Sequence, residues 1–208
     1  MDNYLHSAFA PPLTIKAGDR QQFGQLYGSS FGLVIAAAAR EHSGMVLVLT
    51  PDTASATRLE EELQFYNGGG DAIPILSFPD WETLPYDTFS PYQDTISERL
   101  ATLNLLPQLQ RGILILPIST LMHRLSPRGY IEGGSLMLDV GDTLELDSMR
   151  RRLESNGYSC VSQVMEHGDF AVRGSLLDLY PMGSKQPYRI ELFDDEVESI
   201  RTFDVDSQ

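Results

Sequence analysis

Two short runs of continuously apolar residues constrain the fold of this chain most strongly. They are residues 46–49 (VLVL) and residues 113–116 (ILIL). Neither run alternates with polar residues, so each is typical of a strand that is buried on both faces. Helical periodicity lies between them, because Leu59, Leu63 and Tyr66 fall on one face of a helix. Strands that alternate with helices predict an α/β fold with a mostly parallel sheet.

The pattern changes after residues 126–129 (SPRG), which have the composition of a turn. A strand is expected at residues 136–140, followed by a helix that begins near Asp147 and ends at Gly157. Further strands joined by tight turns are expected at residues 159–164, 170–172, 176–180, 188–193 and 199–203. We therefore predict two domains, an α/β domain at residues 1–129 and a small α+β domain at residues 130–208.

A stretch near the N-terminus has the outline of a phosphate-binding loop but not its chemistry. Residues 25–39 (QLYGSSFGLVIAAAA) combine a turn of small residues with an apolar helix. A nucleotide loop of this kind needs a lysine for the phosphate oxygens and a hydroxyl group for magnesium. With Gly28 on the loop, Phe31 and Gly32 take those two positions, and neither of the chain's two lysines stands next to the loop. We expect no nucleotide hydrolysis and no cofactor.

Other catalytic and metal-binding interpretations have less support. The four histidines are scattered without ligand spacing, so no metal site is expected. Cys160 lies in a strand pattern and is interpreted as a core residue, not a nucleophile. The loop at residues 79–91 gathers carboxylates and aromatic rings, as acid/base chemistry or a sugar site would require. An ordered loop held by Trp81 and Tyr86 is favoured instead, and no catalytic residue is assigned.

The net charge of the chain restricts its partners. The formal charge is −14 at pH 7. Such a surface repels phosphate backbones, so no direct nucleic-acid binding is expected. No run of about 18 apolar residues suggests a membrane span, and a single cysteine fits a reducing compartment. The expected location is cytoplasmic, with no membrane partner.

Against this acidic background, two arginines in strand-rich segments are candidate binding residues. Arg173 lies near Phe170, and Arg189 lies near Phe193. Arginine beside an exposed aromatic ring on a rigid sheet is typical of an interface hot spot. The alternative is pairing within the domain, for which the candidate carboxylates are Asp169, Glu191 and Asp194. A third group of arginines, residues 150–152, is interpreted as the solvated face of a helix.

Three longer motifs resemble one known family. They are residues 80–91 (DWETLPYDTFSP), residues 121–124 (LMHR) and residues 164–183 (VMEHGDFAVRGSLLDLYPMG), the last continuing to Glu196. With these motifs the chain resembles the N-terminal region of the bacterial transcription-repair coupling factors (Mfd), which is itself built like part of the repair helicase UvrB. The resemblance covers nearly all of the chain after the first dozen residues.

The resemblance implies both a fold and a function. The first domain is expected to be a degenerate RecA-like helicase domain of the UvrB type, and the second domain is expected to bind UvrA. Arg173, Arg189 and Phe193 look like the positions that the family uses to contact UvrA. The chain is thus expected to be a non-catalytic adaptor that recruits UvrA and links stalled RNA polymerase to nucleotide excision repair.

Two alternatives remain open at this stage. One is an ATP-dependent DNA translocase or helicase module whose nucleotide site is misread from the sequence. The other is an autoinhibitory module that contacts another domain of its parent chain. The family's DNA translocase and RNA-polymerase-binding domains match no part of this chain, so motor activity and polymerase binding are expected elsewhere in the parent.

Overall fold

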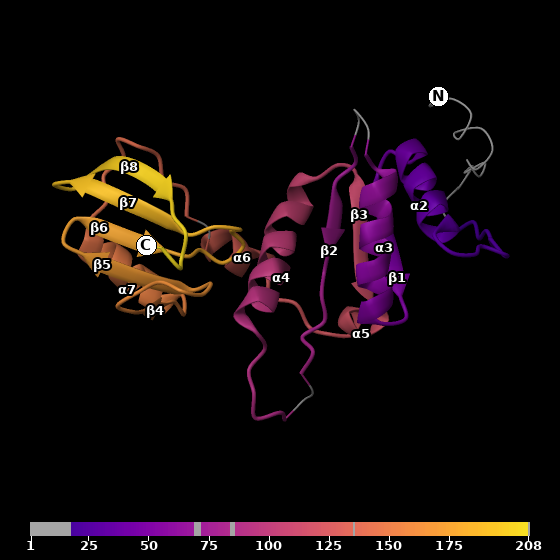
Figure 1. The fold of residues 1–208 in the computed structure, drawn as a ribbon, viewed down its shortest axis with the longest axis horizontal. Helices are drawn as coiled ribbons and strands as arrows, with labels where there is room; N and C mark the ends of the chain where they lie inside the picture. Colours follow the sequence, from indigo (N-terminus) through magenta and orange to yellow (C-terminus); the bar gives the residue numbers. More distant parts are fainter. Residues whose placement is uncertain (1–17, 69–71, 84–85, 135, 208) are drawn as a thin grey trace. The chain divides into compact units, whose positions relative to one another are not determined.

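The computed structural model describes residues 18–68, 72–83, 86–134 and 136–207, which fall into two compact units (Figure 1). The first unit holds the described residues up to Asp80 together with residues 105–124. The second unit holds residues 81–104 and the described residues from 125 onward. Each unit has its own sheet. The predicted domain boundary near residue 129 remains a prediction.

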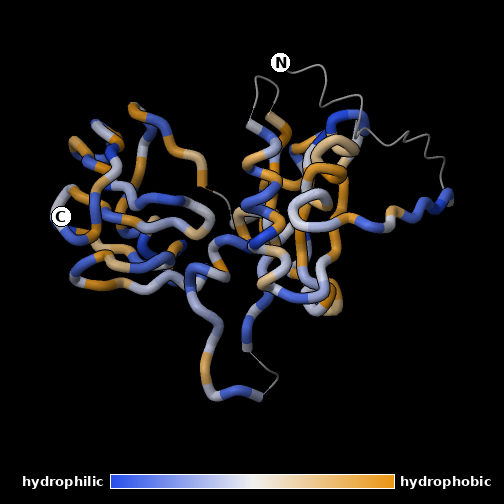
Figure 2. Tube along the Cα trace, turned by 45° about the vertical axis from the view of Figure 1, so that its right-hand side comes forward, coloured by the Kyte–Doolittle hydropathy of each residue, from blue (hydrophilic) through white to orange (hydrophobic). Residues whose placement is uncertain are grey.

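The first unit contains a three-stranded parallel sheet. Strand β3 (Gly112–Pro117) lies between β1 (Met45–Thr50) and β2 (Ile75–Ser77) and runs parallel to both. The two apolar runs of the sequence form β1 and β3, which pair residue by residue. Figure 2 shows hydrophobic residues along much of this sheet. The predicted α/β fold with a mostly parallel sheet is confirmed.

Helices α2 (Ser30–Glu41) and α3 (Thr53–Tyr66) pack on one face of this sheet. Helix α3 begins after Asp52, whose side chain accepts a hydrogen bond from the backbone N–H of Ser55 at 2.7 Å. The buried core of the unit consists of Ala36, Ala39, Val48, Ala56, Leu59, Leu63, Ile73, Ile113 and Ile115. The helical face predicted from Leu59 and Leu63 is therefore the face that packs on the sheet.

The opposite face of the first sheet is more open. Because side chains alternate along a strand, Leu47 and Leu49 of β1 point away from α2 and α3. Both are exposed, so the expectation that residues 46–49 are buried on both faces is wrong. The 3₁₀ helix η1 (Leu106–Gln108) precedes β3, and helix α5 (Ile118–Leu121) follows it directly. Helix α5 begins immediately after the strand, because Pro117 is both the last residue of β3 and the N-cap of the helix.

The second unit is built around a five-stranded sheet in the order β4-β5-β6-β7-β8. Its strands are β4 (Ser159–Cys160), β5 (Asp169–Arg173), β6 (Leu176–Leu179), β7 (Tyr188–Phe193) and β8 (Glu196–Thr202). Strands β4 and β5 are parallel, and the other neighbours are antiparallel. Helices α6 (Arg128–Gly134) and α7 (Leu146–Ser155) belong to this unit, as does almost all of α4 (Gln93–Leu105).

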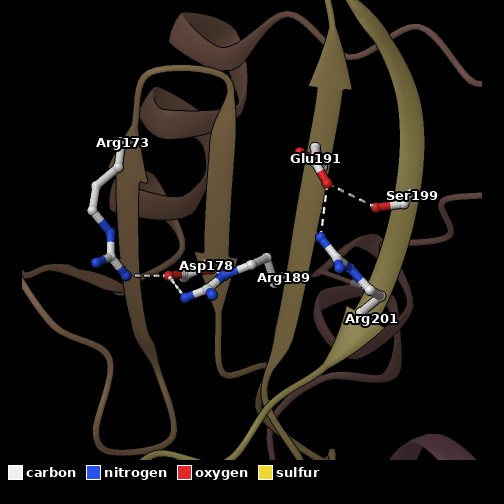
Figure 3. A network of polar contacts seen from close by, with 6 residues as sticks. All are labelled: Arg173, Asp178, Arg189, Glu191, Ser199 and Arg201. Carbon is white, nitrogen blue, oxygen red and sulfur yellow. Dashed lines mark hydrogen bonds and ion pairs between the residues drawn. The ribbon is translucent and has the colours of Figure 1, made fainter. Parts of the chain in front are cut away.

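One face of the second sheet packs against α7. Met149 and Leu153 lie one turn apart on α7 and are both buried. They join strand residues in a core of Leu144, Met149, Leu153, Phe170, Leu177, Leu179, Ile190, Leu192 and Val197. The residues between these strand positions point to the other face. Figure 2 shows hydrophobic and hydrophilic residues interspersed through this unit. The face toward α7 is apolar, and the other face carries charged residues of the strands (Figure 3).

Helix α4 is tied to the loops of the second unit by polar contacts. The backbone N–H of Gly183 donates a hydrogen bond to the buried Ser97 hydroxyl at 2.8 Å. One turn earlier on the helix, the Asp94 carboxylate lies 2.9 Å from Nδ1 of His167. The other ring nitrogen of His167 is 2.8 Å from the backbone carbonyl of Ser184. These contacts explain why α4 belongs with the second sheet although it precedes β3 in sequence.

Three further expectations about strand residues are wrong. Residues 136–140 form no strand, and Met137 is 91% exposed. This apolar run lacks a hydrogen-bonded partner strand among the described residues, although Leu138 packs against the core. Cys160 is exposed and not a core residue, because β4 is only two residues long and lies at the sheet edge. Phe170 is fully buried, since its position on β5 faces the α7 side of the sheet.

Of the two aromatic residues expected to hold the loop at residues 79–91, only Trp81 does so. The Arg99 guanidinium lies 4.0 Å from the ring centre of Trp81, a distance typical of a cation–π contact. Arg99 is itself buried. Tyr86, by contrast, is fully exposed and has a positive φ of 76°. The loop is therefore fixed at Trp81, and the expectation that Tyr86 also holds it is wrong.

We predict unequal effects on stability for two phenylalanines of the second sheet. Phe170→Ala should lower the free energy of unfolding of the second unit by about 3–5 kcal/mol, because it leaves a cavity in the core. Phe193→Ala should change it by less than about 0.5 kcal/mol, because Phe193 is 76% exposed. Urea unfolding followed by fluorescence of Trp81, the only tryptophan and part of the second unit, measures both. Equal losses would contradict this assignment of the two faces.

Candidate protein-binding surface

The polar face of the second sheet gathers charged side chains from four neighbouring strands. Its members are Arg173 of β5, Asp178 of β6, Arg189, Glu191 and Phe193 of β7, and Ser199 and Arg201 of β8. We call these seven residues the polar face. Strand register brings them together, since Arg189 pairs with Asp178 on one side and with Arg201 on the other. Figure 3 shows the resulting network, in which Arg173 and Arg189 approach Asp178 from opposite sides.

Asp178 is the centre of this network. Its side chain is only 1% exposed, and it accepts hydrogen bonds from two arginines. The Nε of Arg189 donates to Oδ1 at 2.7 Å, and the Nη2 of Arg189 donates to Oδ2 at 2.8 Å. The Nη2 of Arg173 also donates to Oδ2. The pair with Arg189 is bidentate, which fixes the orientation of the guanidinium group as well as its position.

The ionisation of Asp178 reflects two opposing effects. Burial favours the neutral acid and by itself raises the pKa of Asp178. The hydrogen bonds and positive charges of Arg189 and Arg173 outweigh burial and hold the pKa below its usual value. In the reverse direction, the hydrogen bond to Asp178 raises the pKa of Arg189. The carboxylate is therefore ionised at neutral pH, and the cluster of two arginines and one aspartate carries a net charge of one positive unit.

A second network lies beside the first on β7 and β8. The Nη2 of Arg201 donates to Oε2 of Glu191 at 2.7 Å, and the hydroxyl of Ser199 donates to the same oxygen at 3.3 Å. Its carboxylate is more exposed than that of Asp178, at 38% for Glu191 against 1%, and the Arg201 side chain is 63% exposed. With three arginines and two carboxylates, the polar face is locally cationic on a chain of net charge −14.

Phe193 lies at the end of β7 on the same face. Ile190 and Leu192 of β7 are buried in the core, so the alternation of the strand points Arg189, Glu191 and Phe193 outward. The ring is 76% exposed. It precedes the hairpin turn in which Asp194 has a positive φ of 59°. The polar face thus combines ordered arginines with an exposed aromatic ring, the combination found at many binding hot spots.

The structure places the three candidate residues from the sequence on one face. Arg173 and Arg189 meet at Asp178, which is none of the three carboxylates considered as partners. Asp169 instead accepts the backbone N–H groups of Met165 and Glu166. A signal for Asp178 was present in the sequence, because a lone acid between leucines in LLDL points away from the core. Its pairing with Arg189, however, depends on the register of β6 and β7.

The loop that resembles a phosphate-binding site has an acidic neighbour. Gln25 and Gly28 both have positive φ, and helix α2 begins at Ser30. A Cβ placed on Gly32 in the first turn of α2 would lie 2.9 Å from the Oε2 of Glu62 on α3. Helix N-termini attract anions through their free N–H groups and dipole. A carboxylate already lies against this helix end, and it would repel a nucleotide phosphate.

The described residues offer little for other kinds of site. Within residues 18–68, 72–83, 86–134 and 136–207, no group of three or more His, Cys, Asp or Glu side chains could hold a metal ion. None of the helices in these ranges is long and apolar enough to cross a membrane. The polar face is thus the best-defined candidate site in the described part of the chain.

We predict that Asp178→Asn destabilises the second unit by about 2 kcal/mol at pH 7, because it removes charge-assisted hydrogen bonds to both arginines. The folded-state pKa of Asp178 lies below its unfolded value, so its stabilisation is present above about pH 4 and is lost as pH falls through the folded pKa. Urea unfolding at several pH values should show that the difference in free energy of unfolding between wild type and variant becomes smaller below about pH 4. Glu191→Gln is the matched control, with a loss below about 0.5 kcal/mol. A difference in free energy of unfolding that stays constant with pH would contradict this role of Asp178.

Comparison with known proteins connects this surface to a family. The family model described as the UvrB interaction domain matches residues 136–208, which include every residue of the polar face. Along nearly its whole length the chain is similar to proteins named transcription-repair-coupling factor. It is 48% identical to that of Escherichia coli over 94% of this chain, and 47% identical to that of Haemophilus influenzae over 96%. The identity to that of Myxococcus xanthus is 33% over 93%.

The similarity involves only a small part of each relative. The chain spans 17% of the Escherichia coli and Haemophilus influenzae proteins and 16% of the Myxococcus xanthus protein. Within that part it is nearly continuous, which confirms the resemblance inferred from the sequence motifs. The chain is therefore similar to one segment of the transcription-repair-coupling factors, and its residues 136–208 match the UvrB interaction domain family.

Proposed function

We propose that this chain is a non-catalytic adaptor that recruits UvrA through three residues of the polar face, Arg173, Arg189 and Phe193, and thereby links stalled transcription to nucleotide excision repair. The observation that carries the proposal is the convergence of Arg173 and Arg189 on buried Asp178, with Phe193 exposed on the same sheet face. Such a site needs a protein partner and no cofactor, because it presents donors and an aromatic ring on an open face.

The similarity to transcription-repair-coupling factors supports the biological context of this proposal. Those relatives are named for coupling transcription to repair, and the matched domain is named for an interaction. The polar face lies inside that domain. A role in excision repair of bacterial DNA would place the chain in the cytoplasm, and RNA polymerase would be engaged by other parts of the parent.

The chemistry of the polar face favours an acidic partner surface. An arginine has five N–H donors. The contacts with Asp178 leave three of them on Arg189 and four on Arg173 for a partner. Carboxylates are natural acceptors for such donors. A pocket for the ring of Phe193 would complete the site, and we propose that UvrA supplies both.

We further propose that the first unit is a degenerate helicase domain of the RecA-like, UvrB type that no longer binds nucleotide. Its parallel sheet and the turn before α2 support the relationship in outline. Phe31 stands where a lysine is required, and Glu62 lies against the helix end that would face the phosphates. The translocase activity of the parent is therefore not assigned to this chain.

Alanine variants test the UvrA site. Arg173→Ala, Arg189→Ala and Phe193→Ala should each weaken binding to purified UvrA by more than about 2 kcal/mol, roughly thirtyfold. Arg150→Ala is the matched control, because this exposed arginine lies on α7, which packs against the opposite sheet face. Calorimetric titration with UvrA measures all four. Unchanged affinity in the three polar-face variants would refute the site, as would a loss of the same size in the control.

Nucleotide titration tests the proposed absence of an ATP site. Calorimetry of this chain with Mg-ATP should show no binding at micromolar concentrations, because the loop lacks a lysine and the Glu62 carboxylate lies beside the first turn of α2. A loop variant, Phe31→Lys, should not restore tight binding while Glu62 is present. Micromolar affinity of the unmodified chain would instead favour an ATP-dependent translocase module.

A further inference from the structure

We infer that Asp178 is a positioning residue for partner binding, which holds Arg173 and Arg189 in their binding orientation before the partner arrives. The inference rests on the proposed function, since it concerns how the same face recognises UvrA. Asp178 itself is 1% exposed and does not present its carboxylate to a partner. Its effect on binding must therefore pass through the two arginines.

The fold makes Asp178 a rigid support. It lies on β6, which is hydrogen-bonded to β5 on one side and to β7 on the other. Its neighbours Leu177 and Leu179 are buried in the core and fix the strand. Arg189 stands directly opposite on β7, while Arg173 reaches Asp178 from a position further along β5. One carboxylate thus ties together two side chains from strands that are not neighbours in the sheet.

The arrangement reduces the cost of ordering the arginines. A free arginine side chain has many rotamers, and each side chain immobilised at an interface costs binding free energy. In this structure the contacts with Asp178 restrict both guanidinium groups in the unbound chain. Each nevertheless remains accessible, with 48% of the Arg173 side chain and 25% of the Arg189 side chain exposed. A partner would therefore meet donors that are already aligned.

Positioning and simple charge attraction predict opposite results when Asp178 is neutralised. Removing one negative charge makes the polar face more cationic, so charge attraction alone would tighten binding to an acidic partner. If Asp178 positions the arginines, its loss frees both side chains and weakens binding although the surface has become more positive. The direction of the change in affinity distinguishes the two.

Titration of UvrA with the wild-type chain, Asp178→Asn and Glu191→Gln tests the inference. Each variant removes one negative charge from the same face, but only the first removes hydrogen bonds of Arg173 and Arg189. We expect Asp178→Asn to weaken binding by about tenfold, the combined cost of ordering two arginines. Glu191→Gln should stay within about twofold of the wild type or bind more tightly. Circular dichroism and unfolding curves establish that each variant is folded at the temperature of the titration.

The outcomes separate this inference from the proposed function. If the wild-type chain does not bind UvrA, the proposed function fails. If it binds and Asp178→Asn binds equally well or more tightly, or if Glu191→Gln weakens binding as much, only the positioning role fails. Nuclear magnetic resonance of the unbound wild-type chain provides a test that needs no variant. The Nε–H of Arg189 should exchange with water more slowly than that of Arg201, whereas equal exchange would overturn the inference.

Discussion

The two-residue period of side chains along the second sheet governs this molecule's candidate function. Strands β5 to β7 bury Phe170, Leu177 and Ile190 against α7, so the residues between core positions point the other way. On β8, an irregularity in the pairing with β7 follows the buried Val197, and Ser199 and Arg201 therefore lie beside Glu191 on the other face. Alternation and this irregularity together bring arginines from β5, β7 and β8 onto one surface. A shift of register by one residue would bury the charges and expose the core. The apolar packing of the sheet thus fixes the polar face.

Asp178 adds a second constraint on this face. A buried carboxylate without partners would cost about 3 kcal/mol or more, so the position is stable only while the arginines remain paired with it. The same contacts restrain the arginines that we propose as partner-binding groups. Stability and recognition therefore depend on one cluster, and the exposed ring of Phe193 adds apolar area beside it.

Patterns of single segments predicted much of the fold, whereas contacts between segments were harder to predict. The continuous apolar runs predicted the two paired strands of the parallel sheet, although only β3 is buried along most of its length and one face of β1 is exposed. Residues 136–140 have similar composition, but a strand also needs a hydrogen-bonded neighbour, which one segment cannot reveal. The burial of Phe170 and the exposure of Cys160 depend in the same way on which strands flank them. The Asp178 partner depends on the register of β6 and β7.

A structure of this chain bound to UvrA would test the central claim most directly. We expect UvrA to lie on the polar face. Carboxylates of UvrA should accept hydrogen bonds from those N–H groups of Arg173 and Arg189 that are not bonded to Asp178. The ring of Phe193 should be buried in the partner, and both pairs with Asp178 should persist. A complex in which UvrA contacts α7 or the first unit, and leaves the polar face in solvent, would contradict the account.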